Sequence, residues 1–259
     1  MVKLAGRDSE LNSPEPDIDA GAPSGDSVSV VGYKSGDKSA PPIVWDETYE
    51  YNSKDSNLAD FAKKAKWLGI LKAAQLGKPD MDDATAMYAH YWDNNGEPVE
   101  FDYEEAYRED EGVKKSVDDE IRNTQRGVEE MIQQGQTEFS FTSTEARGNS
   151  EYPTTENWQK AIGGYQQWSS GDVVVDGDTV TMTVTVHAVD RYDFNPGQHD
   201  IASGAPDDDN GRFTEIGWAK PFDSSGEITR TVSWKIGDPD SLTISDEGSP
   251  EENRGGEDR

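Results

Sequence analysis

Four side chains capable of acid–base chemistry lie within one ten-residue stretch, at Asp190, Tyr192, Asp193 and His199. An imidazole held by a carboxylate is the minimal general base for activating water. A second carboxylate can hold a divalent cation against a phosphate. These residue types at this spacing therefore suggest hydrolysis of a phosphate-containing substrate.

A long β-strand is predicted to lead into these residues. From Val180 to Ala188 apolar side chains alternate strictly with Thr and His, which is the period of a strand. The dipeptide Asp176-Gly177 suits a tight hairpin turn, so residues 173–175 and 180–189 should pair antiparallel. The reactive side chains then emerge from the end of one rigid element.

The exit from this strand decides how the four side chains meet. If the strand continues to Asp193, alternation sends Asp190 and Tyr192 to one side and Asp193 to the other. A turn at Pro196-Gly197 then brings His199 toward one of the carboxylates. The alternative is that the stretch is only a polar strand exit built from turn residues.

The run Asp190-x-Tyr192-Asp193, followed after five residues by His199, resembles the signature of the colicin M family. These bacteriocin-like toxins cut the peptidoglycan precursor lipid II between undecaprenol and pyrophosphate. The resemblance covers about residues 160–236 and implies a small half-barrel catalytic domain. It implies that all four residues are catalytic: the carboxylates position Mg²⁺ or the attacking water, His199 is the acid or base, and Tyr192 orients the phosphate.

One position departs from that pattern. The family has an arginine directly after the histidine, whereas this chain has Asp200, a reversal of charge where a pyrophosphate is expected to bind. Arg191 and Arg212 are the candidate phosphate-binding residues that could supply the missing positive charge. The sequence leaves open whether Asp200 abolishes activity.

The composition indicates a folded body with an acidic surface. Among 259 residues, 53 Asp and Glu stand against 24 Lys and Arg, which gives a net charge of −29. A hydrophobic fraction of 32% is low, but 7 Trp, 10 Tyr and 7 Phe favour packed regions. The acid excess extends along the chain, as in proteins that stay hydrated in high salt. We therefore expect a halophilic source; an acidic protein from an ordinary source is the alternative.

Charge and residue content also exclude classes of function. So negative a surface repels phosphate backbones, and nucleic acid is not an expected partner. Without Cys the chain has neither disulfides nor thiolate chemistry. No apolar run reaches the roughly 18 residues of a transmembrane segment, and the N-terminus lacks the apolar core of a secretory signal. We expect a protein that is secreted or delivered by a secretion system without a conventional signal peptide, or otherwise a cytoplasmic one.

Apolar periodicity divides the chain into four segments. Residues 1–42 and 239–259 lack it and are predicted to be disordered tails, with a short extended piece around residues 27–33 as the exception. Residues 43–135 are predicted to form a helical subdomain, and residues 136–238 a β-rich catalytic domain. The predicted fold class is therefore α+β, with an N-terminal helical subdomain followed by a C-terminal antiparallel β half-barrel.

Finer predictions concern single elements. A helix over residues 57–76 should be well buried, because its apolar residues recur at helical spacing. Strands are predicted at residues 212–218 and 227–236 after the central hairpin. His90, on a helix rich in Tyr and Trp, and His187, on the polar side of the central strand, are expected to be packed residues.

Two functions from different classes fit these observations. The first is an antibacterial toxin that hydrolyses the polyprenyl-pyrophosphate linkage of lipid II at a target membrane surface, with an immunity protein as a possible partner. The second is a non-enzymatic binding or structural component of a secreted or viral assembly. In the second, the motif is only a hairpin exit. Toxicity in the periplasm but not in the cytosol would separate the two.

Overall fold

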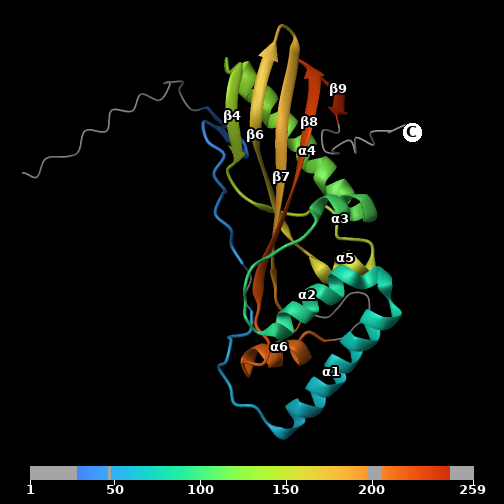
Figure 1. Ribbon diagram of the computed structural model, residues 1–259. Coiled ribbons are helices and arrows are strands. Elements are labelled where there is room, and N and C mark those ends of the chain that lie inside the picture. The colour runs from blue at the N-terminus through green and yellow to red at the C-terminus, as the bar shows by residue number, and fades with distance from the viewer. Residues whose placement is uncertain (1–27, 46–47, 198–205, 246–259) are drawn as a thin grey trace, which may run out of the picture.

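The computed structural model describes residues 28–45, 48–197 and 206–245. It has a mixed α/β architecture built around one long, open sheet of nine strands (Figure 1). The strands are β1 (Ser29–Val30), β2 (Tyr33–Ser35), β3 (Val99–Glu100), β4 (Glu138–Ser143), β5 (Arg147–Gly148), β6 (Gln166–Asp176), β7 (Thr179–Tyr192), β8 (Phe222–Lys235) and β9 (Asp238–Ser245). They pair in the order β1-β2-β4-β6-β7-β8-β3, with β5 beside β6 and β9 beside β8. Every pair is antiparallel except β3 with β8.

Helices precede and interrupt the strands. They are α1 (Leu58–Gly77), α2 (Asp82–Asp93), α3 (Tyr103–Glu109), α4 (Glu111–Gln133), α5 (Glu156–Ala161) and α6 (Asp208–Glu215), with a 3₁₀ turn at Pro79–Met81. Side chains cap the first turns of α1, α3, α4 and α5. In α1 the Asn57 side chain accepts from the backbone of Ala59, and Asp60 accepts from the backbone of Asn57. In Figure 1, α4 runs along the sheet, and α1, α2 and α6 gather at the end opposite the β6–β7 turn.

The predicted central hairpin is confirmed and is longer than expected. Strand β6 pairs with β7 from Gln166 opposite Val189 to Asp176 opposite Thr179. Gly177 in the turn has a φ of 61°, the left-handed conformation that glycine adopts without strain. The alternation along β7 is also confirmed, because Val180, Met182, Val184, Val186 and Ala188 are all fully buried.

One hydrophobic core joins helices and strands. The predicted stripe of α4 is confirmed, since Val113, Val117 and Val128 are fully buried, and Ile121 and Met131 nearly or fully so. This stripe belongs to the same cluster as the inward side chains of β7 and β8 and the aromatic residues of α2 and α3. Segments that the sequence assigns to separate halves of the chain therefore share a core.

Three strand predictions are corrected by the structure. Within the predicted N-terminal tail, the extended piece allowed around residues 27–33 is a pair of strands that runs on to Ser35: β1 and β2 extend the sheet through β4, and Tyr33 is buried. Beyond residue 238, β9 pairs with β8 where a disordered tail was predicted. Residues 212–218 do not form a strand, because α6 covers residues 208–215. The remainder of both predicted tails, residues 1–27 and 246–259, lies outside the described residues.

Helix α1 is where the prediction of burial is wrong. Leu58 is 88% exposed and Phe61 is 58% exposed, although both belong to the apolar stripe that was expected to face the core. Of that stripe, Leu71 is buried. Within the described residues, no helix is long and apolar enough to cross a membrane.

Candidate active site

The end of β7 carries three of the four predicted site residues. Its pairing with β8 continues to the last residue, so that Asp190 lies opposite Ser224 and Tyr192 opposite Phe222. Asp190 and Tyr192 share the parity of the buried residues of β7, and Asp193 follows on the other parity. The predicted division of the motif between two sides of the strand therefore fits the register.

Tyr192 packs into an aromatic cluster between β7 and α2. Its ring stacks on Phe222 with centroids 5.1 Å apart and planes at 13°. The rings of Phe194 and Tyr91 lie 6.0 Å and 6.2 Å away. Burial raises the pKa of Tyr192 well above its usual range, so the phenol stays protonated and can act as a hydrogen-bond donor.

Asp190 has an unusual electrostatic environment. Burial raises the pKa of its carboxyl group well above the usual range, against a stabilising hydrogen bond from the backbone of Arg191. The nearby carboxylates of Asp193 and Asp223 raise it further. A carboxyl group in such a place holds a proton at a pH where ordinary Asp residues have lost theirs.

Asp193 has a pKa closer to neutrality. Burial raises the pKa of its carboxyl group to about 6, although a hydrogen bond from Thr48 and the positive charge of Arg191 both oppose the rise. The Asn195 side chain donates to its Oδ1 at 3.4 Å. Asp193 therefore changes protonation state in the range where a general acid or base is most effective.

Arg191 connects the site to the neighbouring strand. Its Nε lies 3.8 Å from Oδ2 of Asp193, and its Nη1 lies 3.3 Å from Oδ1 of Asp223 on β8. The Arg191 side chain is about one-third exposed, but its Nε is buried and makes no hydrogen bond within the described residues.

Arg212, the second candidate for binding phosphate, lies on α6 and is paired with α1. Its Nη2 lies 2.9 Å from Oδ2 of Asp60, and its Nη1 lies 3.5 Å from Glu215. The same Nη2 donates to the backbone carbonyl of Asp55. A phosphate could use this guanidinium only by sharing it with Asp60.

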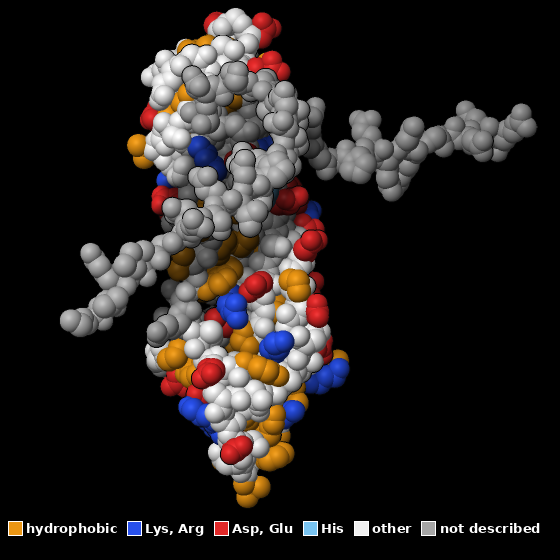
Figure 2. All heavy atoms as spheres, turned by 90° about the vertical axis from the view of Figure 1, so that its left-hand side faces the viewer, with side chains coloured by type: hydrophobic (Ala, Val, Ile, Leu, Met, Phe, Trp, Pro, Cys, Tyr) orange, Lys and Arg blue, Asp and Glu red, His pale blue; other side chains and the backbone are white. Residues whose placement is uncertain are grey.

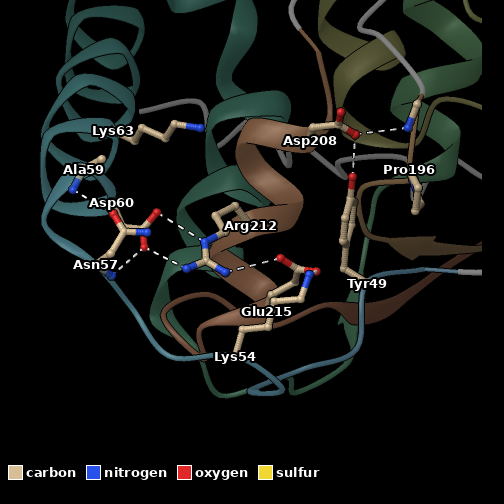
Figure 3. Close-up of a pocket in the computed structure, with 11 residues that line it drawn as sticks. Tyr49, Lys54, Asn57, Ala59, Asp60, Lys63, Pro196, Asp208, Arg212 and Glu215 are labelled. Atoms are coloured by element: carbon tan, nitrogen blue, oxygen red, sulfur yellow. Dashed lines mark hydrogen bonds and ion pairs between the residues drawn. The ribbon is translucent and has the colours of Figure 1, made fainter.

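An open depression of about 590 Å³ lies beside the loop that follows β7 (Figure 3), and its lining includes none of Asp190, Arg191, Tyr192 and Asp193. Pro196 and Gly197 line one side of it, and residues of α1 and α6 line the other. Three cationic side chains lie on its wall together with three carboxylates: Lys54, Lys63 and Arg212, and Asp60, Asp208 and Glu215.

Asp208 ties the exit of β7 to α6. Its Oδ1 accepts hydrogen bonds from the backbone of Gly197 at 3.0 Å and from the Tyr49 hydroxyl at 2.5 Å. Neither Asp208 nor Tyr49 was predicted as a site residue. The signal that could have identified Asp208 is the run of three Asp at residues 207–209, since acidic residues favour the first turn of a helix.

His199 and Asp200 lie outside the described residues, so their expected roles stay predictions. The other two histidines are packed, as expected. His90 Nε2 lies 2.8 Å from the carbonyl oxygen of Glu97. His187 stacks on Trp168 at 3.8 Å, and its Nε2 lies 3.0 Å from Ser170 Oγ.

The described residues contain no clear set of ligands for the expected Mg²⁺. Among the described residues, no group of three or more His, Asp or Glu side chains is arranged to hold a metal ion. The Mg²⁺ site stays a prediction.

Comparison with known proteins adds no relative. No protein-family model, no curated protein sequence and no solved structure matches this chain. The case for a function therefore depends on the residues themselves.

Proposed function

We propose that the chain is an antibacterial toxin of the colicin M type, which hydrolyses the polyprenyl-pyrophosphate linkage of lipid II. The observation that carries the proposal is the pair of carboxyl groups at the exit of β7. The pKa of Asp190 is held well above its usual range, and that of Asp193 is about 6. Carboxyl groups whose environments shift their pKa values apart are typical of acid–base pairs in hydrolases.

The chemistry divides between these groups as follows. Water attacks the phosphorus next to the polyprenyl chain, and Asp193, directly or through His199, accepts the proton of that water. The bond from phosphorus to the polyprenyl oxygen breaks, and the protonated carboxyl group of Asp190 gives its proton to the leaving alcohol. Tyr192 and Arg191 orient the phosphate. When bound, Mg²⁺ would neutralise negative charge on the pyrophosphate.

The charge of the open depression suits such a substrate, although Asp190, Arg191, Tyr192 and Asp193 do not line it. Its wall carries Lys54, Lys63 and Arg212, and cationic groups attract a pyrophosphate. These cations are balanced by carboxylates, so phosphate binding requires them to exchange partners. We also propose that the twist of the long strands β6, β7 and β8 (Figure 1) forms a half-barrel like that implied by the resemblance, around which the helices form a supporting subdomain.

A non-enzymatic binding module is the second candidate, and one observation favours it. Tyr192 lies within a cluster of aromatic rings, where a purely structural role accounts for its presence. In that case the exit of β7 fixes the fold, and function lies on another surface.

Expression in bacteria tests the proposal. The protein directed to the periplasm should cause lysis, because lipid II is exposed there, and the same protein in the cytosol should be harmless. The matched control is Asp193→Asn, produced at an equal level in the periplasm, which should be harmless too. Lysis by both forms would assign toxicity to something other than this site, and harmless wild-type protein that is folded in the periplasm would contradict the proposal.

A further inference from the structure

Helix α1 presents an apolar surface to solvent along its whole length. Five of the twelve large hydrophobic residues that are exposed in the described structure belong to this one helix: Leu58, Phe61, Leu68, Ile70 and Leu76. A helix of 20 residues is about 30 Å long. So long an exposed apolar surface is unusual on a soluble monomer and typically marks an interaction site.

The geometry of the helix gathers most of these side chains on one side. Residues of an α-helix advance by about 100° each, so Leu58 and Leu76, five turns apart, point the same way. Phe61 and Leu68 lie on one flank of that line, where the Phe61 ring also packs 4.8 Å from that of Trp218. Small residues fill its centre: Ala62, Ala65, Gly69 and Ala73. We call this side, from Leu58 to Leu76, the outer face of α1.

The opposite side of α1 is attached to the body. Asp60 and Leu71 are buried there, and the Trp67 ring lies 6.3 Å from that of Tyr88 on α2. Arg212 of α6 holds Asp60 in an ion pair. The outer face therefore cannot turn inward unless these contacts break.

The charge of α1 is opposite to that of the chain. The helix carries four lysines and a single acid, Asp60, in a protein of net charge −29. By the same 100° geometry, Lys72 lies within the outer face, about 40° from the line through Leu58 and Leu76, and Lys66 lies about 80° to the other side of that line. The Nζ of Lys66 is 4.0 Å from Oδ2 of Asp209. Lys63 and Lys64 lie nearer the body, where Lys63 Nζ is 2.6 Å from Asp209 and Lys64 Nζ is 5.1 Å from the Trp218 ring centre.

From this arrangement we infer that the outer face of α1 docks onto an anionic lipid surface. A helix with one apolar face and flanking lysines lies in the plane of a membrane interface, where the lysine stems extend along the apolar region and their ammonium groups reach the headgroups. Two copies of α1 packed face to face would instead bring like charges together, which disfavours self-association through this surface.

The location of the outer face agrees with docking. Figure 1 places α1 at the outer edge of one end of the molecule, and Figure 2 shows hydrophobic and basic side chains together at that end. Asn57, Ala59, Asp60 and Lys63 also line the open depression. Docking would therefore bring the depression to the level of the lipid headgroups, where a lipid-linked pyrophosphate lies. The use of the depression for that pyrophosphate rests on the proposed function, whereas the docking does not.

Flotation with lipid vesicles tests the inference. The full chain is mixed with vesicles of phosphatidylcholine alone or of equal parts phosphatidylcholine and phosphatidylglycerol, without lipid II. Potassium chloride is kept at the lowest concentration at which circular dichroism shows a folded protein. We expect the protein to float with the anionic vesicles and much less with the neutral ones.

Paired variants identify the surface responsible. Leu58→Ser with Leu76→Ser should lower partition into anionic vesicles by about tenfold or more, because two large apolar side chains are lost. Lys66→Gln with Lys72→Gln should lower it by about tenfold, since each basic residue near an anionic surface contributes to binding. The matched control is Val174→Ser with Ile244→Ser, which removes exposed apolar side chains from β6 and β9 and should float like the wild type.

Three outcomes would overturn the docking inference. The wild-type protein could float with neither kind of vesicle. Flotation could survive the Leu58 and Leu76 substitutions. The wild type could sediment as a dimer that these substitutions convert to a monomer. The Asp193→Asn variant should float like the wild type. Wild-type protein that does not float but hydrolyses detergent-dispersed lipid II would reject docking and leave the proposed function intact. Wild-type protein that floats but does not hydrolyse lipid II would reject the function alone.

Discussion

The Nε of Arg191 lies 3.8 Å from Oδ2 of Asp193, two residues further along the chain at the exit of β7. The positive charge of Arg191 lowers the pKa of Asp193, while burial raises it to about 6. The pair therefore keeps a partly buried carboxylate ionised at neutral pH. This balance gives the proposed reaction a pH dependence that can be measured.

Activity is expected to fall as the pH is lowered through about 6, because Asp193 must be ionised to accept a proton. Arg191→Gln removes a positive charge that favours the ionised form, so the acidic limb of the pH–rate profile should move to higher pH. Asp193→Asn should lower kcat/KM by about 10²–10⁴-fold. A profile that is the same for wild type and Arg191→Gln would show that Asp193 does not control this limb.

Loss of the histidine should not add to loss of the carboxylate. If Asp193 and His199 act as one unit, His199→Ala and the double variant should be about as inactive as Asp193→Asn alone. His187→Ala is the control, because His187 is packed against Trp168 on β6, and it should retain most activity. Rate losses that multiply in the double variant would mean that the two residues act independently.

Three features of the fold could be predicted from sequence because each has a local cause. The alternation from Val180 to Ala188 fixes the strand and its buried side, and Gly177 fixes the turn before it. The stripe of α4 fixes the side of that helix that faces the core. Polar residues at the intervening positions of β7, and at all those of α4 except Gly127, make these patterns unambiguous.

Other features depend on contacts that the sequence does not encode locally. Helical spacing in α1 shows that Leu58 and Phe61 share a side but not whether that side meets the core or solvent, and both are exposed. The eight residues of α6 make about two turns, too few to establish a helical period in the sequence. Its buried residues Asn210, Phe213 and Thr214 do not alternate like those of a strand either. The strands β1, β2 and β9 exist because each pairs with an existing strand edge.

The candidate site could be predicted only in part. The sequence predicted Asp190, Tyr192 and Asp193 at the end of the central strand, but not the raised pKa of Asp190, which depends on its burial and on Asp193 and Asp223. Nor did it identify Asp208, which fixes Gly197 from 11 residues further along the chain. Long-range packing determines both properties.

Folding should depend on salt. At a net charge of −29, repulsion among carboxylates weakens the folded state in dilute buffer. The Debye length shortens from about 10 Å at about 0.1 M salt to about 3 Å at about 1 M. Tm measured by circular dichroism should therefore rise between these concentrations of potassium chloride, and an unchanged Tm would remove the case for a halophilic protein.

Stability should also depend on the buried carboxyl group of Glu120 on α4. Ser169 Oγ donates to its Oε1 at 2.9 Å, and burial raises its pKa from 4.5 to about 7. Between these values the folded state holds a proton that the unfolded state has released, so ionisation of Glu120 destabilises the fold as the pH rises.

Glu120→Gln keeps the hydrogen-bonding side chain but cannot ionise. The variant should gain about 1–3 kcal/mol relative to wild type in urea denaturation at about pH 8, and little at about pH 5. Glu130→Gln, an exposed change on the same helix, should alter stability little at either pH. An equal effect of Glu120→Gln at both values would contradict a raised pKa at this position.

Identification of the products formed from lipid II tests the central claim most directly. Folded wild-type protein is incubated with purified lipid II in detergent, with and without Mg²⁺, and the products are separated and weighed by mass spectrometry. The account predicts free undecaprenol and a pyrophosphoryl disaccharide-peptide, both formed at least about a hundredfold more slowly by Asp193→Asn. Intact lipid II under both conditions, or cleavage at any other bond, would contradict it.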